Sequence, residues 1–225
     1  MNKVLKKHSL WGVISRKTSD ENTPEKTIIN ERTTADLNEP MKRSIIKRLP
    51  WLAVLLLLGT GVSATVGLFE SIVAHLPIIM CFQSLILDMA GNVGTQSLAV
   101  AIRVLTDDKI SKKKKLTLIL KECRIGIING LILGLLSFGG IGGYLCITGN
   151  TASFAFSISA CLGTAMVSAM TISAFAGTSI PMIFQKIGID PAVASGPLIT
   201  TVNDMVAVVT YYGLSWLILI QFLHL

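Results

Sequence analysis

The fold class is decided by residues 125–147, which read IGIINGLILGLLSFGGIGGYLCI and carry no charged side chain. A helix needs about 20 mostly apolar residues to cross a bilayer, and this stretch is long enough. The apolar run around it covers about 122–147, and similar runs cover about 50–70, 74–102, 153–185 and 192–223. Only 15% of the residues are charged, against about 25% in soluble domains. The sequence therefore predicts an all-α integral membrane protein with five transmembrane helices.

The basic side chains are confined to three places along the chain. Of the 20 Lys and Arg residues, 11 lie in residues 1–48, eight lie between Arg103 and Arg124, and one is Lys186. With five spans and a cytoplasmic N-terminus, all of these positions face the cytoplasm, as the positive-inside rule requires. We therefore predict a multi-pass protein of the plasma (inner) membrane with its N-terminus inside and its C-terminus outside. The net charge of +7 then reflects topology and lipid contact and implies no nucleic-acid partner.

The sequence divides at about residue 48 into a polar N-terminal segment and a membrane domain. Within residues 1–48, the stretch 18–40 has few large apolar side chains and is expected to be disordered. Residues 5–14 mix apolar side chains with lysines and fit either a short interfacial helix or a flexible tail. Residues 49–225 contain the five predicted spans.

The usual signatures of enzymes and structural metal sites are missing from the sequence. The four cysteines have no metal-ligand spacing, so we expect neither a zinc site nor a disulfide. There is no histidine cluster, no Ser/His/Asp set and no phosphate-binding glycine loop followed by Lys. We therefore expect a protein that is not an enzyme and has no cofactor.

The second predicted span contains an aspartate within a polar stripe. Asp88, Asn92 and Gln96 are spaced four residues apart, which places them on one face of a helix, and Gly91 lies beside them. A carboxylate at this depth costs roughly 2.5–3.5 kcal/mol on insertion scales, and the span offers no basic partner. Carboxylate and amide oxygens are ligands that hard cations prefer. The stripe thus suggests a cation passage, with a cluster satisfied by neighbouring polar groups as the alternative for Asp88.

The fifth span repeats this pattern. Gly196, Thr200 and Asp204 are spaced four residues apart on one helical face, and Pro197, which lacks an N–H, disturbs the helix before Thr200. Asp204 and Asp88 both fall near the middle of their spans, so the two stripes are expected to face one cavity near the bilayer midplane. At the start of this span, Asp190 suits an N-cap position. At its outer end, aromatic side chains suit the membrane interface; they are Tyr211, Tyr212 and Trp216.

The third and fourth spans carry small residues at helical spacing. Gly126, Gly130 and Gly134 are four residues apart, and residues 157–177 are rich in Ser, Thr, Ala and Gly. Small side chains allow the backbones of neighbouring helices to approach closely in a membrane. We interpret these spans as packing elements without chemistry of their own.

Three segments of the sequence resemble the transmembrane domain of the MgtE-type magnesium channel/transporter family, which is related to a family of animal solute carriers. They are the start of the first span (RLPWL, residues 48–52), DMAGNVGTQS at residues 88–97, and DPAVASGPLITTVND at residues 190–204. The resemblance covers about residues 45–225. Family members usually also carry an acidic N-terminal domain and a paired CBS module that sense cytosolic magnesium. In this sequence about 48 polar residues stand in that place, so feedback gating by that route is not expected.

The resemblance implies a homodimer with a pore near its two-fold axis, lined mainly by the second and fifth spans. It implies that Asp204 is the central metal ligand, joined by the backbone carbonyl of Thr200, and that Asp190 belongs to a metal site on the cytoplasmic side. The position of Gly196 is an asparagine in some members. We expect Asp88 and Asn92 to take part in metal binding. The remaining pore-lining positions are expected to be Gly91, Gln96, Gly196, Pro197 and Asn203.

The function predicted from the sequence is a divalent cation channel or transporter for Mg²⁺. Conduction is expected to be passive and driven by the membrane potential, with Asp204 holding a hydrated ion. Two alternatives to passive conduction are also compatible with the sequence. One is a transporter coupled to H⁺ or Na⁺, and the other is a membrane scaffold whose aspartates only pair helices.

Overall fold

A computed structural model describes residues 39–106, 110–188 and 196–223. The predictions for residues 1–38, including the interfacial helix and the disordered stretch, lie outside the described residues, as does the role of Asp190. The chain divides into two units, Met1–Leu52 and Ala53–Leu225, which are taken separately. Helix α3 (Met41–Gly67) contributes residues to both units.

In the first unit, α3 begins at Met41, several residues before the predicted apolar run. The Glu39 carboxylate holds this start in place. It accepts a hydrogen bond from Ser44 Oγ at 3.0 Å, pairs with Lys47, and lies 3.5 Å from Arg43 Nε. The hydrogen bond from Lys47, followed by that from Ser44, lowers the pKa of the Glu39 carboxyl below its ordinary value. These contacts extend the helix into the polar segment.

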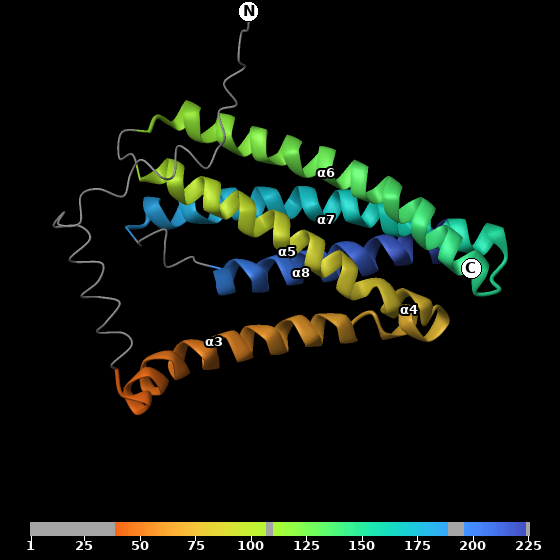
Figure 1. Ribbon diagram of the computed structural model, residues 1–225, viewed down its shortest axis with the longest axis horizontal. Helices are drawn as coiled ribbons and strands as arrows, with labels where there is room; N and C mark the ends of the chain where they lie inside the picture. Colours follow the sequence, from red (N-terminus) through yellow and green to blue (C-terminus); the bar gives the residue numbers. More distant parts are fainter. Residues whose placement is uncertain (1–38, 107–109, 189–195, 224–225) are drawn as a thin grey trace, which may run out of the picture. The chain divides into compact units, whose positions relative to one another are not determined.

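The second unit consists of helices along its described residues (Figure 1). After α3 come the short α4 (Glu70–His75), then α5 (Ile78–Leu105), α6 (Lys112–Ile147), α7 (Ala152–Lys186) and α8 (Gly196–Ser215), which continues as the π-helix η3 (Trp216–Phe222). Among the described residues, five helices are long and apolar enough to cross a membrane. The predicted all-α membrane fold with five transmembrane helices is therefore confirmed.

Helix α6 begins well before its apolar run because the preceding residues favour a helix. Ser111 acts as the N-cap, and its hydroxyl accepts a hydrogen bond from Lys114 N at 3.4 Å. The lysines that follow are good helix formers, so the helix continues without a break into the apolar residues. At the other end, Gly149 has a φ of 95°, and Thr151 caps α7 by accepting from Phe154 N at 3.5 Å.

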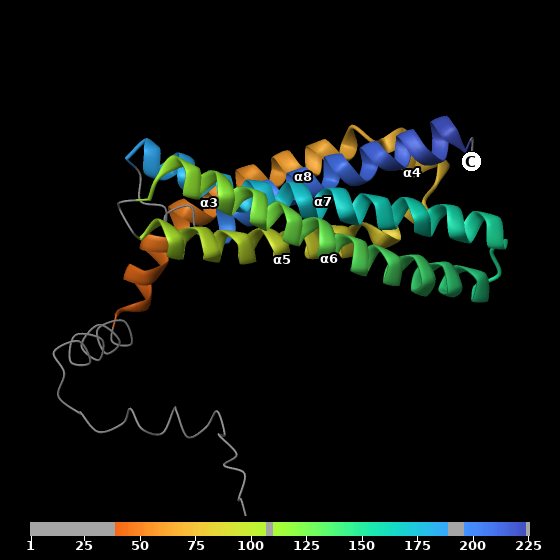
Figure 2. The same cartoon turned by 90° about the horizontal axis from the view of Figure 1, so that it is seen from above.

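Helix α7 is the centre of the packing. It contacts α5, α6 and α8, and Figure 2 shows α6 lying along it. Of its most apolar window, 56% is buried, a larger share than in any other spanning helix of the described chain. Its buried positions are mostly small residues or methionine, which suit a helix that is surrounded by other helices.

The predicted small-residue contact is present between α6 and α7. Gly126, Gly130 and Gly134 are buried on the face of α6 that meets α7. A Cβ atom at Gly130 would lie 2.7 Å from the Cα of Val167, and one at Gly134 would lie 3.0 Å from the carbonyl oxygen of Gly163. Only glycine allows the two backbones to come this close, so the interpretation of this stripe as a packing surface is confirmed.

Tyrosine hydroxyls join α5 to α8. Tyr211 Oη donates to the carbonyl oxygen of Ile79 at 2.7 Å, and Tyr212 Oη donates to Gln83 Oε1 at 2.6 Å. Both tyrosines are buried, whereas Trp216 is 45% exposed. The two tyrosines are therefore covered by protein, and only Trp216 has the exposed side chain that contact with the membrane interface needs. Their hydroxyls find partners on a neighbouring helix, which permits full burial of the rings.

Polar side chains also connect α5, α6 and α7 toward the C-terminal end of α5. Ser97 Oγ donates to the buried carboxylate of Glu122 at 3.0 Å, linking α5 to α6. Lys115 Nζ donates to Gln185 Oε1 at 2.6 Å, and Gln185 Nε2 donates to the carbonyl oxygen of Leu105 at 3.3 Å. These bonds fix the α5 end against its neighbours, and so help to hold the polar face of α5 in position.

Candidate functional site

The polar stripes of α5 and α8 meet at one cavity of about 200 Å³. The side from α5 consists of Leu87, Asp88, Gly91, Asn92 and Thr95, and the side from α8 consists of Thr200 and Asp204. The expectation that Asp88 and Asp204 face a common cavity is thus met by the geometry of a single chain. Five of the residues singled out from the sequence line this space.

Helical periodicity explains which side chains reach the cavity. Asp88, Asn92 and Thr95 follow one another at intervals of four and three residues, and Thr200 and Asp204 are four apart. Gly91 has no side chain, and a Cβ atom placed on it would meet no atom within 4 Å. Space between the two stripes is therefore left open at Gly91.

The electrostatic character of the cavity is set by its two carboxylates. Asp88 is exposed and Asp204 is partly buried, and none of the lining residues is basic. Within the described part of the chain, neither carboxylate has a hydrogen-bond or ion-pair partner. Among the described residues of a single chain, no neighbouring polar group bonds to Asp88. The cavity presents uncompensated negative charge, which favours a cation.

Thr95 is a lining residue that the sequence analysis missed. Its hydroxyl donates to the carbonyl oxygens of Gly91 and Asn92, each at 3.0 Å. Those bonds use the hydroxyl proton and leave oxygen lone pairs available toward the cavity. Thr95 follows Asp88 by two helical turns, so its position on the same face of α5 could have been predicted from the sequence. The four-residue spacing of Asp88 and Asn92 predicted Gln96 instead.

Several predicted pore-lining residues lie away from this cavity. Gln96 and Pro197 are exposed, but neither is among the residues that line the cavity. Asn203 is fully buried instead of facing the cavity. The cavity thus uses one narrow face of each helix, and neighbouring polar positions point elsewhere.

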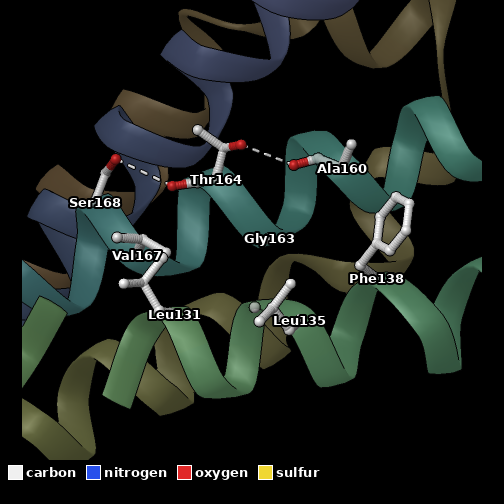
Figure 3. Close-up of a pocket in the computed structure, with 9 residues that line it drawn as sticks. Leu131, Leu135, Phe138, Ala160, Gly163, Thr164, Val167 and Ser168 are labelled. Atoms are coloured by element: carbon white, nitrogen blue, oxygen red, sulfur yellow. Dashed lines mark hydrogen bonds between the residues drawn. The ribbon is translucent and has the colours of Figure 1, made fainter. Parts of the chain in front are cut away.

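A second space, a groove of about 350 Å³ between α6 and α7, has a different chemistry (Figure 3). Leu131, Leu135 and Phe138 form one side, and the hydroxyls on the other side are already bonded within their own helix. Thr164 Oγ1 donates to the carbonyl oxygen of Ala160 at 2.9 Å, and Ser168 Oγ donates to that of Thr164 at 3.0 Å. This groove has no charge and does not suit a metal ion.

One chain alone supplies few metal ligands. No cluster of three or more His, Cys, Asp or Glu side chains is present among the residues that the structure describes. The lining instead offers two carboxylates, one amide and two hydroxyls. Oxygen donors of this kind suit a hard divalent cation that keeps part of its water shell.

Comparison with known proteins identifies the family. The family model named MgtE, divalent cation transporter, matches residues 83–214, a segment that includes both stripes of the cavity. The chain is 40% identical over 182 residues to the magnesium transporter MgtE of Enterococcus faecalis, 80% of this chain and 38% of that protein. It is 36% identical over 169 residues to MgtE of Bacillus subtilis, 75% of this chain and 36% of that protein.

A third relative is more distant. The magnesium transporter MgtE of Thermus thermophilus is 26% identical over 177 residues, which are 77% of this chain and 37% of that protein. The chain therefore spans less than two fifths of the length of the curated relatives it matches. The matched family model covers more than half of the chain, and the chain belongs to the MgtE family of divalent cation transporters.

Proposed function

We propose that this protein conducts Mg²⁺ across the membrane, driven by the membrane potential, through a passage lined by α5 and α8. The observation that carries the proposal is the cavity in which Asp88 and Asp204 lie without a basic or hydrogen-bonding partner in the described chain. A carboxylate removed from water needs a compensating charge. A cation in transit supplies it, and membership of a divalent cation transporter family makes a divalent ion the best candidate.

The lining favours a hydrated ion over a bare one. Magnesium requires octahedral coordination and loses water reluctantly, so proteins often hold it by one or two carboxylates together with its waters. The cavity of about 200 Å³ exceeds several-fold the roughly 30 Å³ that a water molecule occupies in the liquid. We propose that Asp204 is the central ligand, and that Asp88, Asn92 and the Thr200 carbonyl hold the water shell.

A second copy of the chain completes the passage in this proposal. Asp88, Asn92 and Thr200 are exposed on one side of the α5–α8 pair, so a two-fold axis beside them would bring the same groups from a partner. The paired Asp204 carboxylates would then supply about two negative charges, matching a divalent ion. With the N-terminus cytoplasmic and the protein in the plasma membrane, an inside-negative potential adds about 4–5 kcal/mol per divalent ion per 100 mV.

The proposal is tested by Mg²⁺ flux into proteoliposomes at a set K⁺ diffusion potential. Asp204→Asn keeps the shape of the side chain but removes its charge, and we expect Mg²⁺ flux to fall to the background of empty vesicles. The matched control is Glu70→Gln, which removes an exposed carboxylate in α4, away from the cavity lining. Both variants are first checked for insertion and oligomeric state. Wild-type flux in a correctly inserted Asp204→Asn protein would refute the role of Asp204.

One observation favours a second candidate, a transporter coupled to protons. Glu122 is a buried carboxyl in α6 that bonds to Ser97 and does not contribute to the cavity. A buried carboxyl that gains and loses a proton is a common part of coupled carriers. Uptake that follows a pH gradient with the potential clamped to zero would support this candidate and contradict passive conduction. An absence of flux under all gradients would instead support the scaffold alternative.

A further inference from the structure

Asn203 occupies an unusual position next to the proposed metal ligand. Its side chain is 0% exposed, although the residue that follows it, Asp204, lines the cavity. Neither Asn203 Nδ2 nor Asn203 Oδ1 has a hydrogen-bond partner among the residues that the structure describes. Burying an amide without partners costs free energy. An apolar residue would avoid that cost, so the presence of asparagine here calls for a reason.

The contacts of Asn203 show what its side chain does. A Cβ atom placed on Gly94 of α5 would lie 1.9 Å from Asn203 Nδ2, 2.6 Å from its Cγ and 2.8 Å from its Oδ1. The flat amide therefore fills the space beside the Gly94 backbone that a side chain would otherwise take. No hydrogen bond is involved, and the contact is one of shape.

Helix α7 also approaches the Gly94 backbone closely. A Cβ atom on Gly177 of α7 would lie 2.2 Å from the carbonyl oxygen of Gly94. The α5 backbone at Gly94 is thus held between the backbone of α7 and the amide of Asn203 from α8. Movement of α5 toward α7 is blocked by backbone atoms, and movement toward α8 is blocked by the amide.

This three-helix contact lies beside the cavity. Gly94 is flanked along α5 by the lining residues Asn92 and Thr95, and Asn203 precedes Asp204 in α8. The separation of α5 and α8 at Gly94 therefore fixes how far the α5 lining stands from Thr200 and Asp204. With a smaller side chain at position 203, the spacing of α5 and α8 would no longer be held fixed.

We propose that Asn203 is a positioning residue whose buried amide sets the spacing of α5 and α8, and thereby the fit of a hydrated divalent cation between Asp88 and Asp204. This inference rests on the proposed conduction function. Mg²⁺ demands a rigid octahedral shell, whereas Ca²⁺ accepts six to eight oxygen ligands with flexible geometry. A spacing that is held fixed suits the rigid shell, and a spacing that can relax admits Ca²⁺ more readily.

The test is a double-mutant cycle between Asn203 and Gly94, measured as the ratio of Mg²⁺ to Ca²⁺ flux in proteoliposomes. Asn203→Ala removes the spacer, and we expect the ratio to fall at least threefold while Mg²⁺ flux remains measurable. Gly94→Ala adds a Cβ atom where the amide lies and is expected to lower thermal stability. In the double variant the new Cβ atom takes the place of the amide, and we expect the ratio to return to within twofold of wild type.

Two further variants keep the test decisive. Gly213→Ala is the matched control, because a Cβ atom there would meet nothing within 4 Å and the residue lies in the same helix. If Asn203→Ala does not insert into the membrane, Asn203→Ser is used, with a smaller but still measurable fall in the ratio. Thermal unfolding of each purified variant separates loss of fold from loss of discrimination.

The outcomes separate this inference from the function on which it rests. An unchanged ratio in Asn203→Ala or Asn203→Ser, together with loss of Mg²⁺ flux in Asp204→Asn, refutes the spacer role and leaves the conduction proposal intact. Strictly additive effects of Gly94→Ala and Asn203→Ala also refute it, because residues that share one space must be coupled. Absence of wild-type flux refutes both proposals.

Discussion

The α6–α7 pair and the α5–α8 pair are built with the same kind of packing device but have opposite chemistry. At α6–α7, Gly134 and Gly163 bring two backbones together, and the adjoining groove is apolar. Beside α5–α8, Gly94 packs closely against Gly177 and Asn203, and the adjoining cavity is lined by two carboxylates. Close glycine contacts therefore position helices in both regions, and they do not by themselves mark the functional region.

The difference lies in what a helix can do for its own polar side chains. Thr164 and Ser168 have hydroxyl protons, which they donate to backbone carbonyls one turn earlier in the same helix. A carboxylate can only accept, and the N–H groups inside a helix are already used by the backbone. Asp88 and Asp204 must therefore be satisfied from outside their own helices. The groove and the cavity therefore differ in whether a helix can satisfy its own polar side chains, and the number of those side chains is less important.

The largest expected effect tests the packing that the two regions share. Gly177→Ala would place a Cβ atom 2.2 Å from the Gly94 carbonyl oxygen, whereas Gly163→Ala would place one 3.0 Å from that of Gly134. We expect Gly177→Ala to destabilise the protein by about 3 kcal/mol, a fall in Tm of about 6–12 °C for a chain of this size. Gly163→Ala is expected to cost less. Thermal unfolding followed by tryptophan fluorescence measures both, with Gly139→Ala, which meets no atom within 4 Å, as the neutral control. Equal Tm values for the two alanine variants would contradict the ranking.

The next effect tests the chemistry that the two regions do not share. Asp88→Asn removes one of the two cavity charges, and we expect Mg²⁺ flux to fall about tenfold, equivalent to about 1.4 kcal/mol of barrier. Tm in the absence of metal should not fall, because the carboxylate has no partner to lose in the described chain. Unchanged flux, with Asp204→Asn inactive, would restrict the metal site to α8.

A third carboxyl, that of Glu122, is satisfied by a neighbouring helix. Ser97→Ala removes the hydroxyl that donates to the buried Glu122. We expect a loss of about 1–2 kcal/mol of stability, with no change in the rise of Tm that saturating Mg²⁺ produces. Ser84→Ala, at an exposed position of α5, is the matched control. A weaker Mg²⁺ response in Ser97→Ala would mean that this pair belongs to the ion pathway.

The smallest effect is expected in the apolar groove. The double change Thr164→Val and Ser168→Ala removes two hydroxyls whose bonds lie within α7. We expect stability to change by less than about 0.5 kcal/mol and Mg²⁺ flux to remain at the wild-type rate. Thr95→Val in the cavity is the matching variant, and it should reduce flux measurably. Equal flux in the two variants would remove the distinction between the groove and the cavity.

Much of the candidate site could be predicted from spacing along the chain. Intervals of four residues predicted that Asp88 and Asn92 share one helical face and that Thr200 and Asp204 share another. The position of each pair along its span predicted that both lie at the same depth in the membrane. The same rule predicted Gln96 and not Thr95, although intervals of three and four residues both lie on one helical face, and it is Thr95 that lines this cavity. Asn203 was also expected to line the pore, although it is buried beside Gly94.

The sequence by itself determined the membrane class, the five helices and the helical faces that carry carboxylates, because hydrophobic length and helical period are local properties. Only the tertiary structure decided how each helix is rotated toward its neighbours. In a membrane, lipid and protein interior are both apolar, so hydrophobicity does not specify which face of a helix points inward. That choice comes from shape, in the glycine contacts at Gly94, Gly134 and Gly177 and in the amide of Asn203. These contacts turn two polar stripes into a single cavity.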